Sequence, residues 1–180
     1  FSGGFGLNAT YKGFDMSMFF NFMYDFDVLN ANKIMLTTWA DNKENNFLMD
    51  IASDKRWRNF DDMGNEIRYS PEVLAEFNKN ATMWNPTSIG RPICMSYAVE
   101  DGSFLRLNSA TVGYTLPSVW TKKVGLSKVR FYVSGNNLFT LTGYSGYDPE
   151  VNIATGLTPN IDYNRYPRSR TYTFGAQLTF

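Results

Sequence analysis

The feature that most constrains this chain is a regular alternation of apolar and polar residues that runs from Phe14 to Val28. Every second position in this run is apolar or aromatic, and most of the positions between them are polar. A period of two residues predicts a β-strand, because successive side chains of a strand point to opposite faces of its sheet. Strands of globular proteins usually contain about 5–6 residues, so a strand of this length indicates an unusually tall sheet.

The same period recurs at four other places along the chain. The expected strands cover residues 4–11, 14–28, 104–116, 128–142 and 170–180. Lys12-Gly13 and the segment 117–127 form short connections, whereas the connections 30–103 and 143–170 are long. Lys12-Gly13 between two alternating runs is typical of a tight hairpin turn. Short and long connections therefore alternate strictly.

Two architectures contain long alternating strands. A soluble β-sandwich turns its apolar face inward and its polar face to water. A transmembrane β-barrel turns its apolar face to lipid, and it joins its strands by short turns at one end and long loops at the other. The polar positions of this chain hold small residues, and the apolar positions are dense in Phe and Tyr. This composition favours the barrel, with a soluble β-sandwich carbohydrate-binding module as the alternative.

Five strands cannot close a membrane barrel. Bacterial single-chain barrels have an even number of strands, from about 8 upward. An open sheet would leave unpaired backbone groups in hydrocarbon. The barrel interpretation therefore predicts that this all-β chain is a fragment, with its partner strands upstream of Phe1.

Composition excludes several functions. The 17 basic and 17 acidic residues among 180 cancel, so the chain lacks the net positive charge that is typical of nucleic-acid binding. There is no His, so the usual general base and the Ser-His-Asp triad are missing. Neighbouring acids such as Asp61 and Asp62 are not a pair held across a cleft, as a glycosidase requires. We therefore expect no enzyme, no cofactor and no metal site, and a barrel enzyme would need catalytic residues from upstream.

Several segments between residues 100 and 180 resemble one known family. They are Glu100–Asn108 (EDGSFLRLN), Val112–Pro117 (VGYTLP), Tyr132–Thr140 (YVSGNNLFT), Tyr144–Val151 (YSGYDPEV), Tyr166–Arg168 (YPR) and Thr171–Phe180 (TYTFGAQLTF). In their order and spacing they resemble the SusC/RagA-type TonB-dependent transporters of the outer membrane. Residues 1–28 resemble the preceding hairpin, and residues 30–99 match only loosely, as a variable loop does.

The resemblance implies the last five antiparallel strands of a large transmembrane barrel of about 22 strands, with extracellular loops at 30–103 and 143–170. The plug, the TonB box and the rest of the barrel are absent from the sequence. Members of this family import glycan or peptide fragments. The implied partners are a surface lipoprotein of the SusD type, TonB through the absent N-terminal part, outer-membrane lipid and lipopolysaccharide, and the barrel-assembly machinery.

The ending of the chain has a predicted role of its own. The candidate assembly signal consists of Tyr172, Phe174, Gly175, Ala176, Leu178 and the last residue, Phe180. Outer-membrane barrels commonly end in this way, and the insertion machinery recognises the ending; an ordinary edge strand is the alternative. The implied location is the outer membrane of a Gram-negative bacterium of the Bacteroidota type. With Phe180 in the periplasm, both long loops lie outside the cell.

One conflict of parity predicts a local irregularity. Leu105 and Leu107 have the opposite parity to Val112 in the same expected strand. A β-bulge near Asn108-Ser109 would bring them to one face by inserting an extra residue. We predict such a bulge, or else that the two leucines lie above the membrane.

The long connections hold the candidate contact residues. The first contains an expected short helix that begins at Pro71, with Ser70 as its N-cap. Aromatic and Arg side chains suit stacking on sugars and the anchoring of protein partners. The candidate contacts to substrate or to the lid lipoprotein are Trp39, Trp57, Arg58, Trp84, Tyr144 and Tyr147. Packing of these side chains within the loops is the alternative.

Two further features of the connections have alternative interpretations. Asp148 and Glu150 are oxygen donors that suit calcium, but the spacing of an EF-hand is absent. A turn at Asp148-Pro149 is the alternative. The single Cys94 permits no internal disulfide, and we expect it to be buried as a small apolar residue.

Overall fold

The computed structural model describes residues 1–38, 47–51, 55–86, 93–151 and 160–180. The chain divides into two compact units. The first unit comprises Phe1–Val28, Glu100–Asn160 and Arg165–Phe180, and the second comprises Leu29–Val99 and Ile161–Asn164. Within the described ranges, every helix is too short or too polar to cross a membrane.

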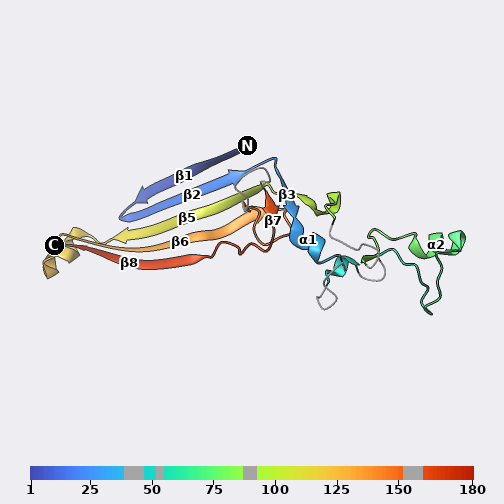
Figure 1. Ribbon diagram of the computed structural model, residues 1–180. Coiled ribbons are helices and arrows are strands. Elements are labelled where there is room, and N and C mark those ends of the chain that lie inside the picture. Colours follow the sequence, from blue (N-terminus) through green and yellow to red (C-terminus); the bar gives the residue numbers. More distant parts are fainter. Residues whose placement is uncertain (39–46, 52–54, 87–92, 152–159) are drawn as a thin grey trace. The chain divides into compact units, whose positions relative to one another are not determined.

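The first unit is built on a five-stranded antiparallel sheet with the order β1-β2-β5-β6-β8 (Figure 1). Its strands are β1 (Ser2–Tyr11), β2 (Phe14–Met23), β5 (Phe104–Thr115), β6 (Lys128–Thr142) and β8 (Thr171–Thr179). Each strand pairs with the large-sheet strand that precedes it in the chain, so the sheet is a meander. In the described part of the chain the sheet is open, and β1 and β8 are its two edges.

One face of this sheet, the apolar face, carries aromatic and aliphatic side chains along its length. Directly paired residues share a face, and one such row joins Phe14, Tyr114 and Phe131. Residues on this face that are 40–76% exposed include Phe5, Leu7, Tyr11, Phe14, Val112, Phe131, Val133, Phe139, Leu141, Tyr172, Phe174 and Leu178. A sandwich core would bury this face, so its exposure argues against the soluble β-sandwich alternative.

The opposite face, the polar face, carries small and polar side chains, and a charged pair spans it near the short turns. Arg130 on β6 reaches Asp15 on β2 with two hydrogen bonds, from Nε to Oδ1 at 2.9 Å and from Nη2 to Oδ2 at 2.5 Å. Gly113 lies opposite Asp15 on the strand between them. A Cβ at position 113 would lie 2.4 Å from Nη2 of Arg130. Glycine therefore leaves the space through which the arginine reaches its partner.

The predicted β-bulge is present on β5. Ser109 pairs with Phe19 and Leu107 pairs with the next residue, Phe20, so Asn108 is the extra residue. The bulge returns Leu107 to the apolar face, beside Phe20. The parity conflict in the sequence is therefore resolved within the strand.

A second irregularity follows on β6. Asn137 and Leu138 lie opposite the bulged Asn108, and Asn137 has φ 53° in the left-handed region. The bulge on β5 shifts the pairing by one residue, and the extra residue on β6 shifts it by one more. Together the two shifts leave the alternation of faces along β6 unchanged. The apolar positions of β6 therefore keep one parity from end to end.

The strand that the alternation predicted over 14–28 is too long, because β2 ends at Met23. Asp25 has φ 61°, and its N–H donates to Oγ of Ser103 at 3.0 Å. A residue in the left-handed region interrupts an extended strand. The chain re-enters an extended conformation in β3 (Asp27–Asn30), which belongs to a different sheet.

A small core explains why the alternation continues past the end of β2. Val28, Tyr144 and Val151 are buried together, and Phe26 packs against them. The N–H of Gly102 donates to the carbonyl of Phe26 at 2.9 Å, and a Cβ at Gly102 would lie 2.5 Å from Val28. Phe26 and Val28 thus keep the apolar period but contact a local core of the first unit.

The second unit contains short elements. They are α1 (Ala31–Met35), η1 (Met49–Ile51), α2 (Pro71–Asn78), η3 (Ser96–Ala98) and β7 (Ile161–Asp162). A three-stranded sheet has the order β4-β3-β7, with β4 at Val99–Asp101. The predicted helix is present as α2, but the side chain of Ser70 makes no capping hydrogen bond. The carbonyl of Ser70 accepts the N–H of Leu74 at 2.9 Å instead.

The contact between Gly113 and Arg130 makes a prediction for stability. We expect Gly113→Ala in the full-length protein to lower the free energy of unfolding by about 1–3 kcal/mol, the usual cost of overpacking. Gly143→Ala is the matched control, because nothing lies within 4 Å of its added Cβ. Thermal unfolding in detergent measures both variants, and an equal effect of the two would contradict the explanation.

Candidate functional site

A cluster of charged side chains fixes the long connection 143–170 to the polar face of the sheet. Arg106 lies near the start of β5, and its side chain is 2% exposed. Its Nη2 donates to Oδ1 of Asp148, and its Nε lies 3.6 Å from Oε2 of Glu150. Burying a cation costs several kcal/mol unless a partner neutralises it. The two acids of the connection are these partners.

A second arginine completes this anchoring cluster. Nη2 of Arg168 donates to Oε1 of Glu150 at 2.6 Å, and the N–H of Arg168 donates to Oδ2 of Asp148 at 3.3 Å. The N–H of Glu150 donates to Oδ1 of Asp148 at 3.0 Å. Two arginines and two carboxylates balance in charge. Asp148 and Glu150 therefore link Arg168, near the end of the connection, to the strand residue Arg106.

The carboxyl group of Asp148 has a lowered pKa. Burial alone would raise it, but the hydrogen bond from Arg106 and the backbone N–H groups of Glu150 and Arg168 outweigh burial, because they stabilise the charged form. Asp148 is thus held ionised at neutral pH, as its partners require.

Asp148 and Glu150, the candidate calcium ligands, have other partners in the structure. Both carboxylates are occupied by arginines. In the ranges that the structure describes, no three acidic, His or Cys side chains gather as a metal site would require. Arg106 is the residue that sequence reasoning missed. The only sign of its role in the sequence is that it is a charged residue in a predicted strand whose other polar positions hold small residues.

The candidate contact residues of the second unit differ in exposure. Trp57 is 41% exposed, and its backbone N–H donates to the carbonyl of Met83 at 2.7 Å. Arg58 lies over the ring of Phe77 at 5.3 Å and bonds Asp62 at 2.7 Å. These two neighbours form part of the surface beside α2.

Trp84 is a packing residue in the structure. Its Nε1 donates to the carbonyl of Thr37 at 3.3 Å, and its ring meets the edge of Tyr97 at 5.2 Å. Tyr97 in turn donates its hydroxyl to Asp50 at 2.6 Å. Trp39 lies outside the described residues.

The two tyrosines of the connection 143–170 have opposite roles. Tyr144 is 6% exposed and belongs to the small core, so it offers little surface to a ligand. Tyr147 is 85% exposed, three residues further along the chain. Of this pair, Tyr147 alone keeps the exposure that a contact residue needs. Cys94 is exposed, so the expectation that it is buried is wrong.

The residues of the candidate assembly signal lie on the edge strand β8 and directly after it. Tyr172, Phe174, Ala176 and Leu178 share the apolar face, because they pair with Gly135, Val133, Phe131 and Val129. Gly175 lies on the polar face opposite Tyr132, and a Cβ there would lie 2.3 Å from the Tyr132 ring. Their role in assembly stays a prediction.

Comparison with known proteins gives relatives of much greater length. No model of a known protein family matches the chain. The TonB-dependent receptor P3 of Formosa agariphila is 34% identical over 186 aligned positions, which cover 100% of this chain and 16% of that receptor. The TonB-dependent receptor SusC of Bacteroides thetaiotaomicron is 36% identical over 88 positions, which cover 47% of this chain and 8% of SusC. The chain thus spans 16% or less of the length of these relatives.

Solved structures share the fold. A structure of the RagAB peptide transporter matches 99% of this chain and 17% of its own chain, with a TM-score of 0.73 and 25% identity. The RagAB peptide importer in the 'open-open' state matches the same shares, with a TM-score of 0.71 and 25% identity. The antiparallel sheet therefore corresponds to part of a RagA-type barrel wall.

Fold and comparisons together define a segment of a TonB-dependent receptor. The chain is homologous to such receptors of the SusC/RagA family. The relatives are named as receptors and as a transporter, which agrees with the expectation that this chain is not an enzyme.

The anchoring cluster predicts unequal roles for its two arginines. We expect Arg106→Gln to lower the free energy of local opening by about 3–5 kcal/mol, because it leaves a buried carboxylate unpaired. Arg168→Gln is the control, since its side chain is 49% exposed, and we expect less than about 1 kcal/mol. Hydrogen exchange of the Glu150 amide in the full-length receptor measures both, and equal loss of protection would contradict the assignment.

The lowered pKa of Asp148 predicts a dependence on pH. A carboxyl whose folded pKa is depressed contributes stability above its unfolded pKa, about 3.9, and loses it as the pH falls through the folded value. We therefore expect stability from this group to be constant from neutral pH down to about 4 and to fall below that. Asp148→Asn should flatten this acid step in thermal unfolding, and an unchanged step would assign it to other carboxylates.

Proposed function

We propose that the chain is a wall and mouth segment of an outer-membrane importer that takes up glycan or peptide fragments in a TonB-dependent manner. The observation that carries the proposal is the open sheet with an exposed apolar face and a polar, charge-paired opposite face. Lipid covers an apolar face of this kind in membrane barrels, and the lumen contacts the polar one. The homology to TonB-dependent receptors supports the same assignment.

The orientation in the membrane follows from the ends of the sheet. The turn Lys12-Gly13, the connection 116–127 and the end of β8 share one end, as their registers require. The long connections leave from the other end. Because barrels of this type have short periplasmic turns and long extracellular loops, we place Phe180 on the periplasmic side. The barrel-assembly machinery then meets β8 as the exposed edge.

The partners proposed are a SusD-like lipoprotein at the extracellular mouth and TonB through the part of the receptor that this chain does not contain. The solved RagAB structures are described as a peptide importer, whereas SusC is described only as a TonB-dependent receptor. Among the residues that the structure describes, we propose Trp57, Arg58 and Tyr147 as contacts for the lipoprotein or the substrate. Lipid and lipopolysaccharide surround the apolar face.

Purification of the full-length receptor from native outer membranes in mild detergent tests this function. We expect the receptor in the membrane fraction, with a surface lipoprotein bound to it. Recovery as a freely soluble protein without a lipoprotein would favour the carbohydrate-binding sandwich instead.

The same preparation tests the contact residues. We expect Tyr147→Ala or Trp57→Ala to raise the Kd for the isolated lipoprotein, or for the bound fragment, by roughly 30-fold. This is the effect of removing an anchoring aromatic side chain that contributes about 2 kcal/mol to binding. Tyr166→Ala is the matched control, because Tyr166 is 86% exposed in the same connection as Tyr147. An equal rise in Kd for the Tyr166→Ala control would contradict the assignment of Tyr147 and Trp57 as contact residues.

A further inference from the structure

The connection between β5 and β6 has an inside-out pattern of burial. It contains α3 (Ser118–Thr121) and η4 (Lys122–Val124). The polar Thr121 is 2% exposed, whereas Val119, Trp120 and Val124 are 60–71% exposed. A segment surrounded by water has the reverse preference. These apolar side chains therefore match surroundings that are themselves apolar.

The backbone holds this connection in one place. The N–H of Leu126 donates to the carbonyl of Thr121 at 3.1 Å, and the N–H of Ser127 donates to the carbonyl of Thr179 on β8 at 2.8 Å. Gly125 has φ 75°, which reverses the chain after η4. Trp120 is thus presented from a scaffold tied to two strands.

The same end of the sheet is positively charged. Lys12, Lys122, Lys123 and Lys128 are exposed there. In the three segments that meet at this end, 10–16, 113–130 and 175–180, Asp15 is the one acidic side chain, and Arg130 already binds it. The chain as a whole has no net charge, so the positive charge is local.

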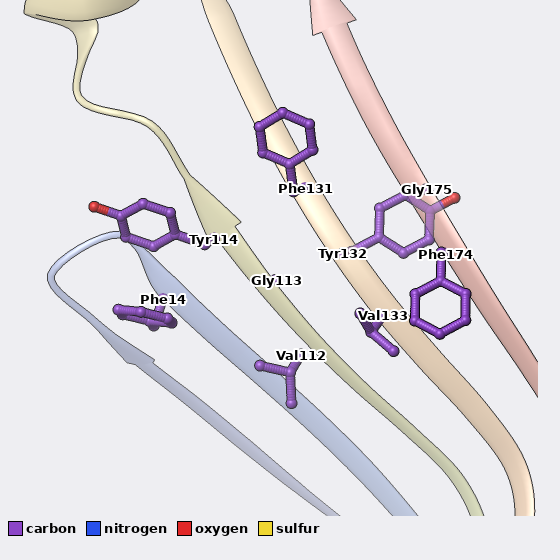
Figure 2. A pocket seen from close by; sticks show the side chains of 9 residues that line it. All are labelled: Phe14, Val112, Gly113, Tyr114, Phe131, Tyr132, Val133, Phe174 and Gly175. Atoms are coloured by element: carbon purple, nitrogen blue, oxygen red, sulfur yellow. The ribbon is translucent and has the colours of Figure 1, made fainter.

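An apolar hollow of about 340 Å³ lies on the apolar face at this end (Figure 2). Its lining includes Phe14, Val112, Tyr114, Phe131, Val133 and Phe174. A second hollow, also about 340 Å³, is lined by the turn Lys12-Gly13 and by Asp15, and Phe14 lines both hollows. An apolar slot thus adjoins a basic turn, the arrangement that a hydrocarbon chain with a charged head requires.

We propose that this end of the sheet binds an anionic phospholipid of the leaflet that faces the periplasm. The acyl chain lies in the apolar hollow, Trp120 and Val124 enter the boundary between head groups and chains, and Lys12, Lys122 and Lys123 bind the phosphate. Tryptophan with lysine is typical of segments that lie in this boundary. The proposal rests on the proposed function, because that function places the apolar face in a membrane.

Quenching of tryptophan fluorescence by brominated lipid tests the site. The full-length receptor is placed in nanodiscs of phosphatidylethanolamine and phosphatidylglycerol, with either lipid brominated. The difference between the receptor and its Trp120→Phe variant isolates the signal of Trp120. We expect brominated phosphatidylglycerol to quench this signal more strongly than brominated phosphatidylethanolamine.

Lysine variants identify the groups that bind the head group. Each lysine that contacts it should contribute roughly five-fold to the preference, the equivalent of about 1 kcal/mol per basic residue at an anionic surface. Replacement of Lys12, Lys122 and Lys123 by Gln should therefore abolish the preference. Lys55→Gln and Lys79→Gln, at exposed lysines of the second unit, should leave it unchanged.

Each contrary outcome has its own meaning. Equal quenching by both lipids, or a preference that survives the three lysine substitutions, overturns the site. Loss of the preference in excess inorganic phosphate at constant ionic strength assigns the lysines to free phosphate and also overturns it. Failure of the receptor to enter nanodiscs, measured separately by size-exclusion chromatography, overturns the proposed function itself.

Discussion

An antiparallel sheet with one apolar face needs an apolar cover for that face, and in hydrocarbon it also needs partners for its edge strands. The rest of this structure depends on that constraint. The apolar face remains exposed along five strands, while the charges of the sheet lie on the other face and neutralise one another. Within the described residues, β1 and β8 form the edges of the sheet and each pairs with one neighbour only. The relatives are several times longer than this chain, which spans 16% or less of their length.

Much of the sheet could be predicted because the same two-residue period specifies both the strand and its faces. The bulge at Asn108 was predictable for the same reason, since one extra residue is the simplest way to return Leu107 to the apolar face. The end of β2 was not predictable. Phe26 and Val28 continue the period beyond Met23, and a period reports which face a side chain occupies but not what covers that face.

The anchoring cluster was beyond sequence reasoning for a different reason. Arg106 and Asp148 are 42 residues apart, and the path of the connection between them decides whether they meet. Asp148 and Glu150 alone were compatible with a turn or a cation. Tyr144 and Tyr147 are alike in sequence, yet one lies in the small core and the other is exposed. Local pattern identifies strands well, and it says little about how a long connection folds back onto them.

The bridge from Asp15 to Arg130 has a mechanical consequence. It passes over Gly113 and so joins β2 to β6 across the strand between them. Backbone hydrogen bonds connect only adjacent strands, whereas this pair connects strands that are not neighbours. Separation of β2 from β5, or of β6 from β5, therefore has to break this side-chain pair as well as the backbone ladder.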